Sequence, residues 1–145
     1  MGFRFTLESV LRFREGIEKR EELALQRVQF EVARVRRCIE ELTQELAKAG
    51  NEREDALQSW MQAFRLKDLQ DEMNTAVETR EALLEDLATL KRQSEERMKI
   101  YQAARVNRRM LTDLQKQQRE AWEQQQLRIE QKRQDDVFTA RLQRG

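Results

Sequence analysis

The chain has 145 residues, of which 38% are charged, with four glycines, no proline and a formal net charge of +1. This composition excludes an ordinary globule, because the turns of a compact fold draw on Gly, Pro, Asn, Asp and Ser, and it favours long helices instead. It also argues against an enzyme, since there is no histidine to act as general base or metal ligand, and the single cysteine, Cys38, permits no internal disulfide or zinc cluster. We therefore predict no catalytic, cofactor-binding or metal site.

The first predicted element starts close to the N-terminus, in the stretch "FRFTLESVLRFREGIEKREE", residues 3–22. Thr6 is the predicted N-cap, with Glu8 in the first turn. An apolar stripe is expected to clasp the two chain ends by meeting three apolar residues near the C-terminus. The residues of the stripe are Phe5, Val10, Phe13 and Ile17, and the C-terminal residues are Trp122, Ile129 and Phe138.

A first heptad seam follows, in which seam residues recur at alternating steps of three and four. Its positions are Leu25, Val28, Val32, Val35, Ile39, Leu42, Leu46, Ala49, Arg53, Ala56 and Trp60. The seam predicts a first helix over about residues 5–55. Gly50 followed by Asn51 is the only helix-stop signal in the middle of the chain.

A second seam runs in a register that does not join the first. Its positions are Leu66, Leu69, Met73, Ala76, Arg80, Leu83, Leu87, Leu90, Ser94, Arg97, Tyr101, Ala104, Arg108 and Leu111. A turn is therefore expected somewhere in residues 50–66, with a second helix over about 62–140. One bent helix that pairs with a second chain would also fit, but a hairpin buries both seams in one molecule. We predict an all-α fold, a single long two-helix antiparallel coiled-coil hairpin spanning residues 1–145.

Several seam positions of the second arm are polar: Arg80, Ser94, Arg97, Arg108, Gln118 and Gln125. Polar seam residues set register or mark a partner at a cost in stability, although arginine stems also lie along a seam with their charge in water. Charge is sorted as well, with ten acids and four bases in residues 51–90 against six acids and twelve bases in 91–134. Acids interleave with the bases, so a solvated helix face is preferred and no nucleic-acid partner is predicted.

Three stretches resemble one family. Residues 3–22 resemble the N-terminus of FliJ, a coiled-coil component of the bacterial flagellar type III export apparatus. "EQKRQDDVFTAR", residues 130–141, is similar to the C-terminal signature of that family, and "LQDEMNTAVE", residues 69–78, is similar to its stretch after the hairpin. The three motifs occur in the family's order along the whole chain.

The resemblance implies a non-enzymatic stalk and coupling protein. FliJ proteins bind the hexameric flagellar export ATPase and the cytoplasmic domain of the export gate protein, and they help to handle export chaperones. The expected location is the cytoplasmic face of the inner membrane at the flagellar base, with peripheral membrane association through partners only and no membrane span. Alternatives are the stalk protein of a virulence-type secretion system and a self-associating coiled-coil scaffold.

Two sets of binding residues follow from the resemblance. The export-gate set is Leu69, Met73, Ala76 and Arg80, and the first three are explained equally well as seam residues. The ATPase set is Arg128, Lys132, Arg133, Asp135 and Asp136. A solvated helix end is the alternative there, but acids near a helix C-terminus oppose the helix dipole, which favours the functional interpretation. The apolar N-terminal stripe is a further candidate for the ATPase contact.

Overall fold

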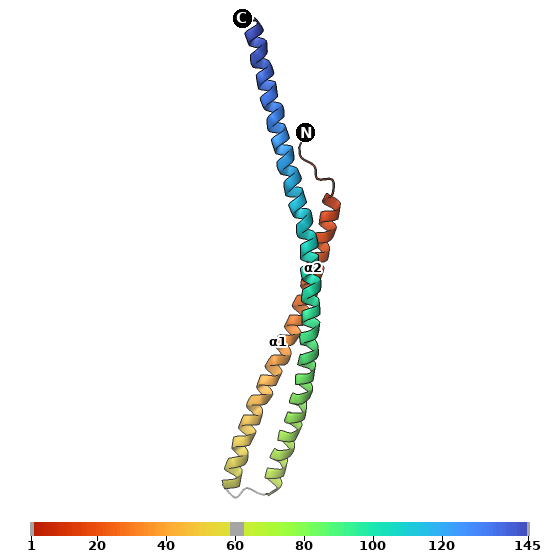
Figure 1. Cartoon of the computed structure of the whole chain (residues 1–145). Helices are drawn as coiled ribbons and strands as arrows, with labels where there is room; N and C mark the ends of the chain where they lie inside the picture. The colour runs from red at the N-terminus through yellow and green to blue at the C-terminus, as the bar shows by residue number, and fades with distance from the viewer. Residues whose placement is uncertain (1, 59–62, 145) are drawn as a thin grey trace. The chain divides into compact units, whose positions relative to one another are not determined.

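The protein folds as a hairpin of two long helices. The computed structural model describes residues 2–58 and 63–144. Within these residues there are two helices, α1 (Glu8–Gln58) and α2 (Ala63–Arg144), and no strand (Figure 1). The predicted all-α class and the two-helix hairpin are confirmed.

The start of α1 differs slightly from the prediction. The carbonyl of Leu7 accepts the first helical hydrogen bond, from the N–H of Leu11 at 2.9 Å, so Leu7 takes the N-cap position in place of Thr6. Glu8 lies in the first turn, where its charge interacts favourably with the helix dipole. It also forms an ion pair with Arg12 at 3.2 Å, one turn further along the helix.

The helix-stop signal at Gly50 and Asn51 does not end α1, which continues through both residues to Gln58, close to the predicted helix end near residue 55. A glycine inside a helix costs about 1 kcal/mol relative to alanine, which a long run of good helix formers offsets. The interval predicted for the turn, residues 50–66, therefore includes helix on both sides. Its remaining residues, 59–62, lie outside the part of the chain that the structure describes.

The chain divides into two units, each with one stretch of α1 and one of α2. The terminal unit holds the residues up to Arg20 together with those from Tyr101 onward, and the middle unit is Glu21–Ile100. In the middle unit Glu21 of α1 pairs with Arg97 of α2. Further along α1, Leu46 lies beside Met73, which comes earlier on α2, so the helices run antiparallel. The buried apolar side chains of this unit are Leu25, Val32, Val35, Ala56 and Leu69.

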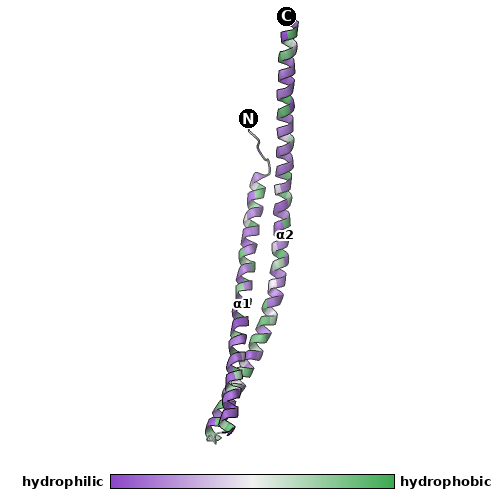
Figure 2. Cartoon of the chain, turned by 90° about the vertical axis from the view of Figure 1, so that its left-hand side faces the viewer, coloured by the Kyte–Doolittle hydropathy of each residue, from purple (hydrophilic) through white to green (hydrophobic). Residues whose placement is uncertain are grey.

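The two predicted seams are confirmed by burial. Among the described residues, every position of both series is buried or half-buried except Arg53 and Arg97, while Trp60 lies outside the description. Figure 2 shows hydrophobic residues recurring along both helices among hydrophilic ones, as a narrow seam requires. Gln118 and Gln125, the two predicted polar seam positions furthest along α2, are exposed.

In the terminal unit the chain segments also run antiparallel. Glu18 on α1 bonds to Arg108 on α2, and the ring centroid of Phe3 lies 6.1 Å from that of Trp122. The buried apolar side chains of this unit are Phe5, Leu11 and Ala104. Beyond Trp122, every described side chain of α2 is exposed, from residue 123 to residue 144. We call residues 123–144 the C-terminal segment.

The predicted apolar stripe of α1 is only partly correct. Phe5 is buried and Ile17 half-buried, but Val10 and Phe13 are exposed. Because α1 begins at Glu8, Phe5 precedes the helix and does not set its phase. The buried or half-buried row that continues the first seam towards the N-terminus is Leu11, Arg14, Glu18 and Glu21.

Candidate functional site

The C-terminal segment carries large apolar side chains that no other part of the described chain covers. These exposed residues are Leu127, Ile129, Val137, Phe138 and Leu142. The expected contact of the N-terminal stripe with Ile129 and Phe138 is therefore wrong, and the paired region ends near Trp122. A helix in water normally buries such residues along one face, so this exposed group is a candidate interaction surface.

All five residues predicted to bind the ATPase lie on the C-terminal segment and are exposed. Within the part of the chain that the structure describes, none of the five forms an ion pair. Arg128, Lys132 and Asp135 follow one another at steps of four and three, so they share one side of the helix. Asp136 stands one turn after Lys132, and Arg133 lies on the neighbouring face. The structure thus brings this set together, with every charge available to a partner.

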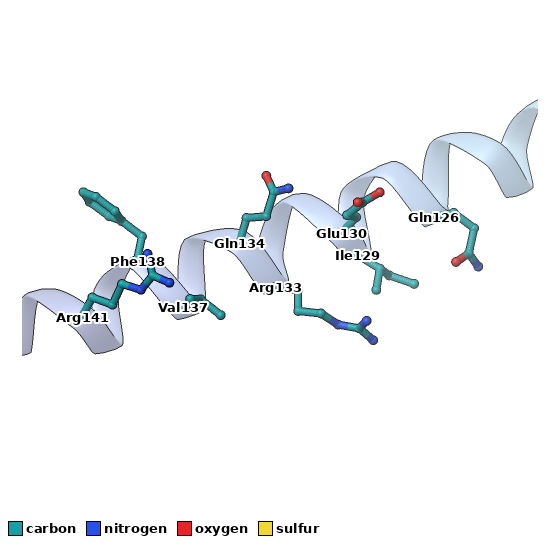
Figure 3. Close-up of a pocket in the computed structure, with 8 residues that line it drawn as sticks. All are labelled: Gln126, Ile129, Glu130, Arg133, Gln134, Val137, Phe138 and Arg141. Carbon is teal, nitrogen blue, oxygen red and sulfur yellow. The ribbon is translucent and has the colours of Figure 1, made fainter.

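A shallow hollow runs along another face of the C-terminal segment (Figure 3). Its lining residues all belong to α2: Gln126, Ile129, Glu130, Arg133, Gln134, Val137, Phe138 and Arg141. In Figure 3, Arg133 and Val137 point to one side of the helix and Phe138 and Gln134 to the other. Apolar side chains beside a guanidinium are typical of surfaces that bind protein, because the arginine contributes both a stem to pack and a charge to pair.

An ion pair in the seam of the terminal unit holds the two helices in register. The Glu18 carboxylate accepts hydrogen bonds from Arg108 Nε at 2.6 Å and Nη2 at 3.3 Å. Arg108 also donates from Nη1 to Thr112 Oγ1 at 3.5 Å. The hydrogen bond from Arg108 lowers the pKa of the Glu18 carboxyl below its ordinary value; partial burial opposes this shift, and the charges of Arg108 and Arg105 support it. Two parallel bonds to one carboxylate fix a single geometry, so this pair specifies which turn of α1 faces which turn of α2.

The four predicted export-gate residues lie in the middle unit on the face of α2 that packs on α1. Leu69 is buried, with 4% of its surface exposed, and Met73, Ala76 and Arg80 are half-buried. Arg80 Nε is buried without a hydrogen-bond partner among the described residues. Leu69 is therefore a seam residue, whereas the other three keep part of their surface open to solvent.

A groove between the helices of the middle unit extends this surface onto α1. Its lining residues are Leu42 and Glu45 from α1, with Asp71, Glu72, Thr75, Ala76 and Thr79 from α2. A smaller adjoining groove brings Met73 beside Leu46 and Ala49. Sequence reasoning missed the α1 side, although the antiparallel register of the two seams points to it. The carboxylates at the groove make it acidic, in agreement with the charge sorting along the chain.

Other kinds of site were sought in the same residues. Over the described ranges, no group of three or more acidic or cysteine side chains is arranged to hold a metal ion. Neither described helix contains a stretch long and apolar enough to cross a membrane. Cys38 is a half-buried free thiol in the middle unit.

Comparison with known proteins assigns the chain to a family. The family model of the flagellar FliJ protein matches residues 3–145. The chain belongs to the FliJ family. The match covers all three stretches that resemble FliJ, so the predicted family is confirmed, and this member of a non-enzymatic family is a flagellar export-related protein. Comparisons with curated proteins and with solved structures gave no match.

Proposed function

We propose that this FliJ-family protein is a stalk and coupling protein that binds the hexameric flagellar export ATPase through its C-terminal segment. It also contacts the cytoplasmic domain of the export gate protein through the groove of the middle unit and assists in handling export chaperones. It works in the cytoplasm at the inner membrane of the flagellar base and reaches the membrane only through its partners. The observation that carries the proposal is the uncovered C-terminal segment.

The C-terminal segment has few contacts that stabilise it in the free protein, and a partner that covers it would supply them. The segment is about 30 Å long at 1.5 Å per residue, and it lacks the tertiary packing from which most helical stability in proteins comes. Its exposed apolar residues, Phe138 among them, gain free energy when a partner buries them. Exposed charges of both signs on more than one side suit a partner that surrounds a helix, as a ring does.

The groove of the middle unit has the opposite character. Glu45, Asp71 and Glu72 surround the half-buried Ala76, so a basic surface with a small apolar contact would complement it. This chemistry supports a partner distinct from that of the C-terminal segment, and we assign it to the export gate. The matching family is a flagellar one, which supports the flagellar export system over a virulence-type secretion system.

The test is ATP hydrolysis by the cognate export ATPase, with and without the full-length protein. Lys132→Glu with Arg133→Glu is expected to weaken binding about tenfold, because two charges at the contact are reversed. This double variant should therefore stimulate ATP hydrolysis less than the native protein does. The matched control is Lys91→Glu with Arg92→Glu, which reverses the same Lys-Arg pair at an exposed position of the middle unit.

Two results would contradict the proposal. The first is that the native protein neither co-elutes with the ATPase nor changes its hydrolysis rate. The second is that both double variants weaken binding equally, which would show a dependence on net charge alone. Light scattering identifies the remaining alternative, since an obligate dimer would indicate a self-associating scaffold, whereas a stalk is expected to be monomeric.

A further inference from the structure

A third surface lies on α1 in the middle unit and shares no residue with the two regions discussed above. Leu23, Arg27, Phe30, Arg34 and Arg37 follow one another at steps of four and three and are all exposed. Their spacing places them in one row along the helix, about 20 Å long. We call this row the Phe30 face.

The Phe30 face points away from the helix interface. The neighbouring seam residues Leu25, Val32 and Val35 are buried against α2, and their helical phase is nearly opposite to that of Leu23 and Phe30. Phe30 is 64% exposed and Leu23 is 45% exposed. Burial in the hairpin therefore does not account for either apolar side chain.

The charge on this face is positive and only partly compensated. The row carries three arginines and no acid, with Glu31 on the neighbouring face and Glu41 one turn after Arg37. Glu31 is occupied by Arg34, which donates to it from Nη2 at 2.8 Å and from Nε at 3.1 Å. Among the described residues, Arg27 and Arg37 form no ion pair. Two guanidinium groups, of Arg27 one turn before Phe30 and of Arg37 two turns after it, are thus open to carboxylates of a partner.

We propose that the Phe30 face binds an acidic amphipathic helix of another protein. Leu23 and Phe30 are seven residues apart, which is the repeat at which one helix offers apolar side chains to another. The arginines beside them complement carboxylates, because the planar guanidinium pairs with a carboxylate through two parallel bonds. A helix with apolar residues at heptad spacing and flanking Glu or Asp satisfies both requirements.

Other occupants fit less well. Nucleic acid favours an unbroken run of basic side chains with aromatic platforms, and it offers little to an aliphatic residue such as Leu23. A membrane surface calls for a whole apolar helix face, whereas this one has two apolar residues. A second copy of the chain would have to bring its acidic stretch, residues 51–90, against this face, and two of those acids, Asp71 and Glu72, line the groove of the middle unit.

The probe is a fluorescein-labelled synthetic helix of about 20 residues, with Leu at the heptad a and d positions and Glu at e and g. Fluorescence anisotropy measures its binding to the full-length protein. Phe30→Ala and the pair Arg27→Glu with Arg37→Glu are each expected to raise Kd at least about tenfold. Phe138→Ala is the matched control, because Phe138 has nearly the same exposed fraction, 65%, on the C-terminal segment. A peptide with Lys in place of Glu should not bind.

The proposal is overturned if the Glu and Lys peptides bind equally, if neither binds, or if Phe30→Ala and Phe138→Ala have the same effect. Light scattering adds a further outcome: a dimer that Phe30→Ala converts to monomer would assign the face to a second copy and refute the proposal. Circular dichroism is used to check that each variant remains helical. Stimulation of the export ATPase should be unchanged in Phe30→Ala, so the two proposals fail independently.

Discussion

The middle unit and the terminal unit pair the same two helices by different means. In the middle unit a row of apolar side chains, including Leu25, Val35 and Leu69, is buried between the helices. In the terminal unit the row on α1 is largely polar, and the Glu18–Arg108 ion pair joins it to α2. The comparison indicates that apolar burial stabilises the middle unit, whereas an ion pair sets the register of the terminal unit.

Apolar contact and ion pairing differ in how strictly they define an arrangement. Burial of apolar surface is non-directional, so a seam of Leu and Val tolerates small shifts of one helix along the other. A carboxylate that accepts two bonds from one guanidinium has a single good geometry. We therefore expect changes to the middle unit to affect mainly the free energy of unfolding, and changes to the Glu18–Arg108 pair to affect the register as well.

The largest effect is expected from a charge placed in the middle-unit seam. Val35 is 3% exposed, so Val35→Asp buries a carboxylate without a partner and should lower the free energy of unfolding by about 3 kcal/mol. Urea denaturation followed by circular dichroism measures the loss. Ala33→Asp introduces the same carboxylate at an exposed position two residues away and should lower stability by less than about 1 kcal/mol, mainly through the lower helix propensity of aspartate. Equal losses in the two variants would show that this seam is not the stabilising element.

The next effect concerns pH. The folded-state pKa of Glu18 is lowered, mainly by the hydrogen bond from Arg108, so its contribution is present above the unfolded-state pKa and is lost as the pH falls through the folded-state value. Glu18→Gln should lower the free energy of unfolding by about 1 kcal/mol at pH 7, with a much smaller difference at pH 3. Denaturation at a series of pH values measures this.

The control for the pH experiment is Glu123→Gln. Glu123 pairs with Arg119 at 3.5 Å, but both side chains are largely exposed, so this pair should contribute little at any pH. A double-mutant cycle with Arg108→Gln isolates the coupling of Glu18 to Arg108 from their other interactions. Identical pH profiles for Glu18→Gln and Glu123→Gln would contradict a special role for the seam pair.

A smaller effect is expected at the end of the paired region. The rings of Phe3 and Trp122 are tilted by 51° with centroids 6.1 Å apart, a geometry in which aromatic pairs attract. Phe3→Ala should destabilise the terminal unit by about 1 kcal/mol and shift the fluorescence of Trp122 to longer wavelength. Trp60→Phe as background leaves Trp122 as the single reporter. Phe13→Ala removes an exposed phenylalanine from the same unit and should leave the emission unchanged.

Periodic features are well predicted from the sequence, because many apolar residues at regular spacing indicate the same buried face. The steps of three and four from Leu25 to Ala56 identify the seam even though no single residue does. The helix-stop signal at Gly50 does not end α1, because one glycine is a weak signal inside a 51-residue helix. The N-terminal stripe is only partly correct because Phe5 precedes α1, and the buried row runs through Leu11 and Glu18 in place of Val10 and Phe13.

Cross-helix features were harder to predict for a different reason. The periodicity of each arm shows which face is buried but does not fix which residue of α1 lies opposite which residue of α2. The Glu18–Arg108 pair and the groove at Leu42 and Ala76 depend on that register, so they required the structure. The exposure of the C-terminal segment was not predicted for the same reason: the register decides that the N-terminal stretch pairs with α2 only as far as Trp122.

The smallest effect on stability is expected in the C-terminal segment, and it distinguishes the two units most directly. Phe138→Ala should change the free energy of unfolding by less than about 0.5 kcal/mol, since the side chain has no folded contact to lose. Amide hydrogens of residues 123–144 should exchange far faster than those of the middle-unit seam, because a helix without tertiary contacts opens locally. Slow exchange in the free protein would show that the segment is stable without a partner.

Protection gained on adding the export ATPase, and lost in Lys132→Glu with Arg133→Glu, would show that the partner supplies the contacts that the chain itself lacks.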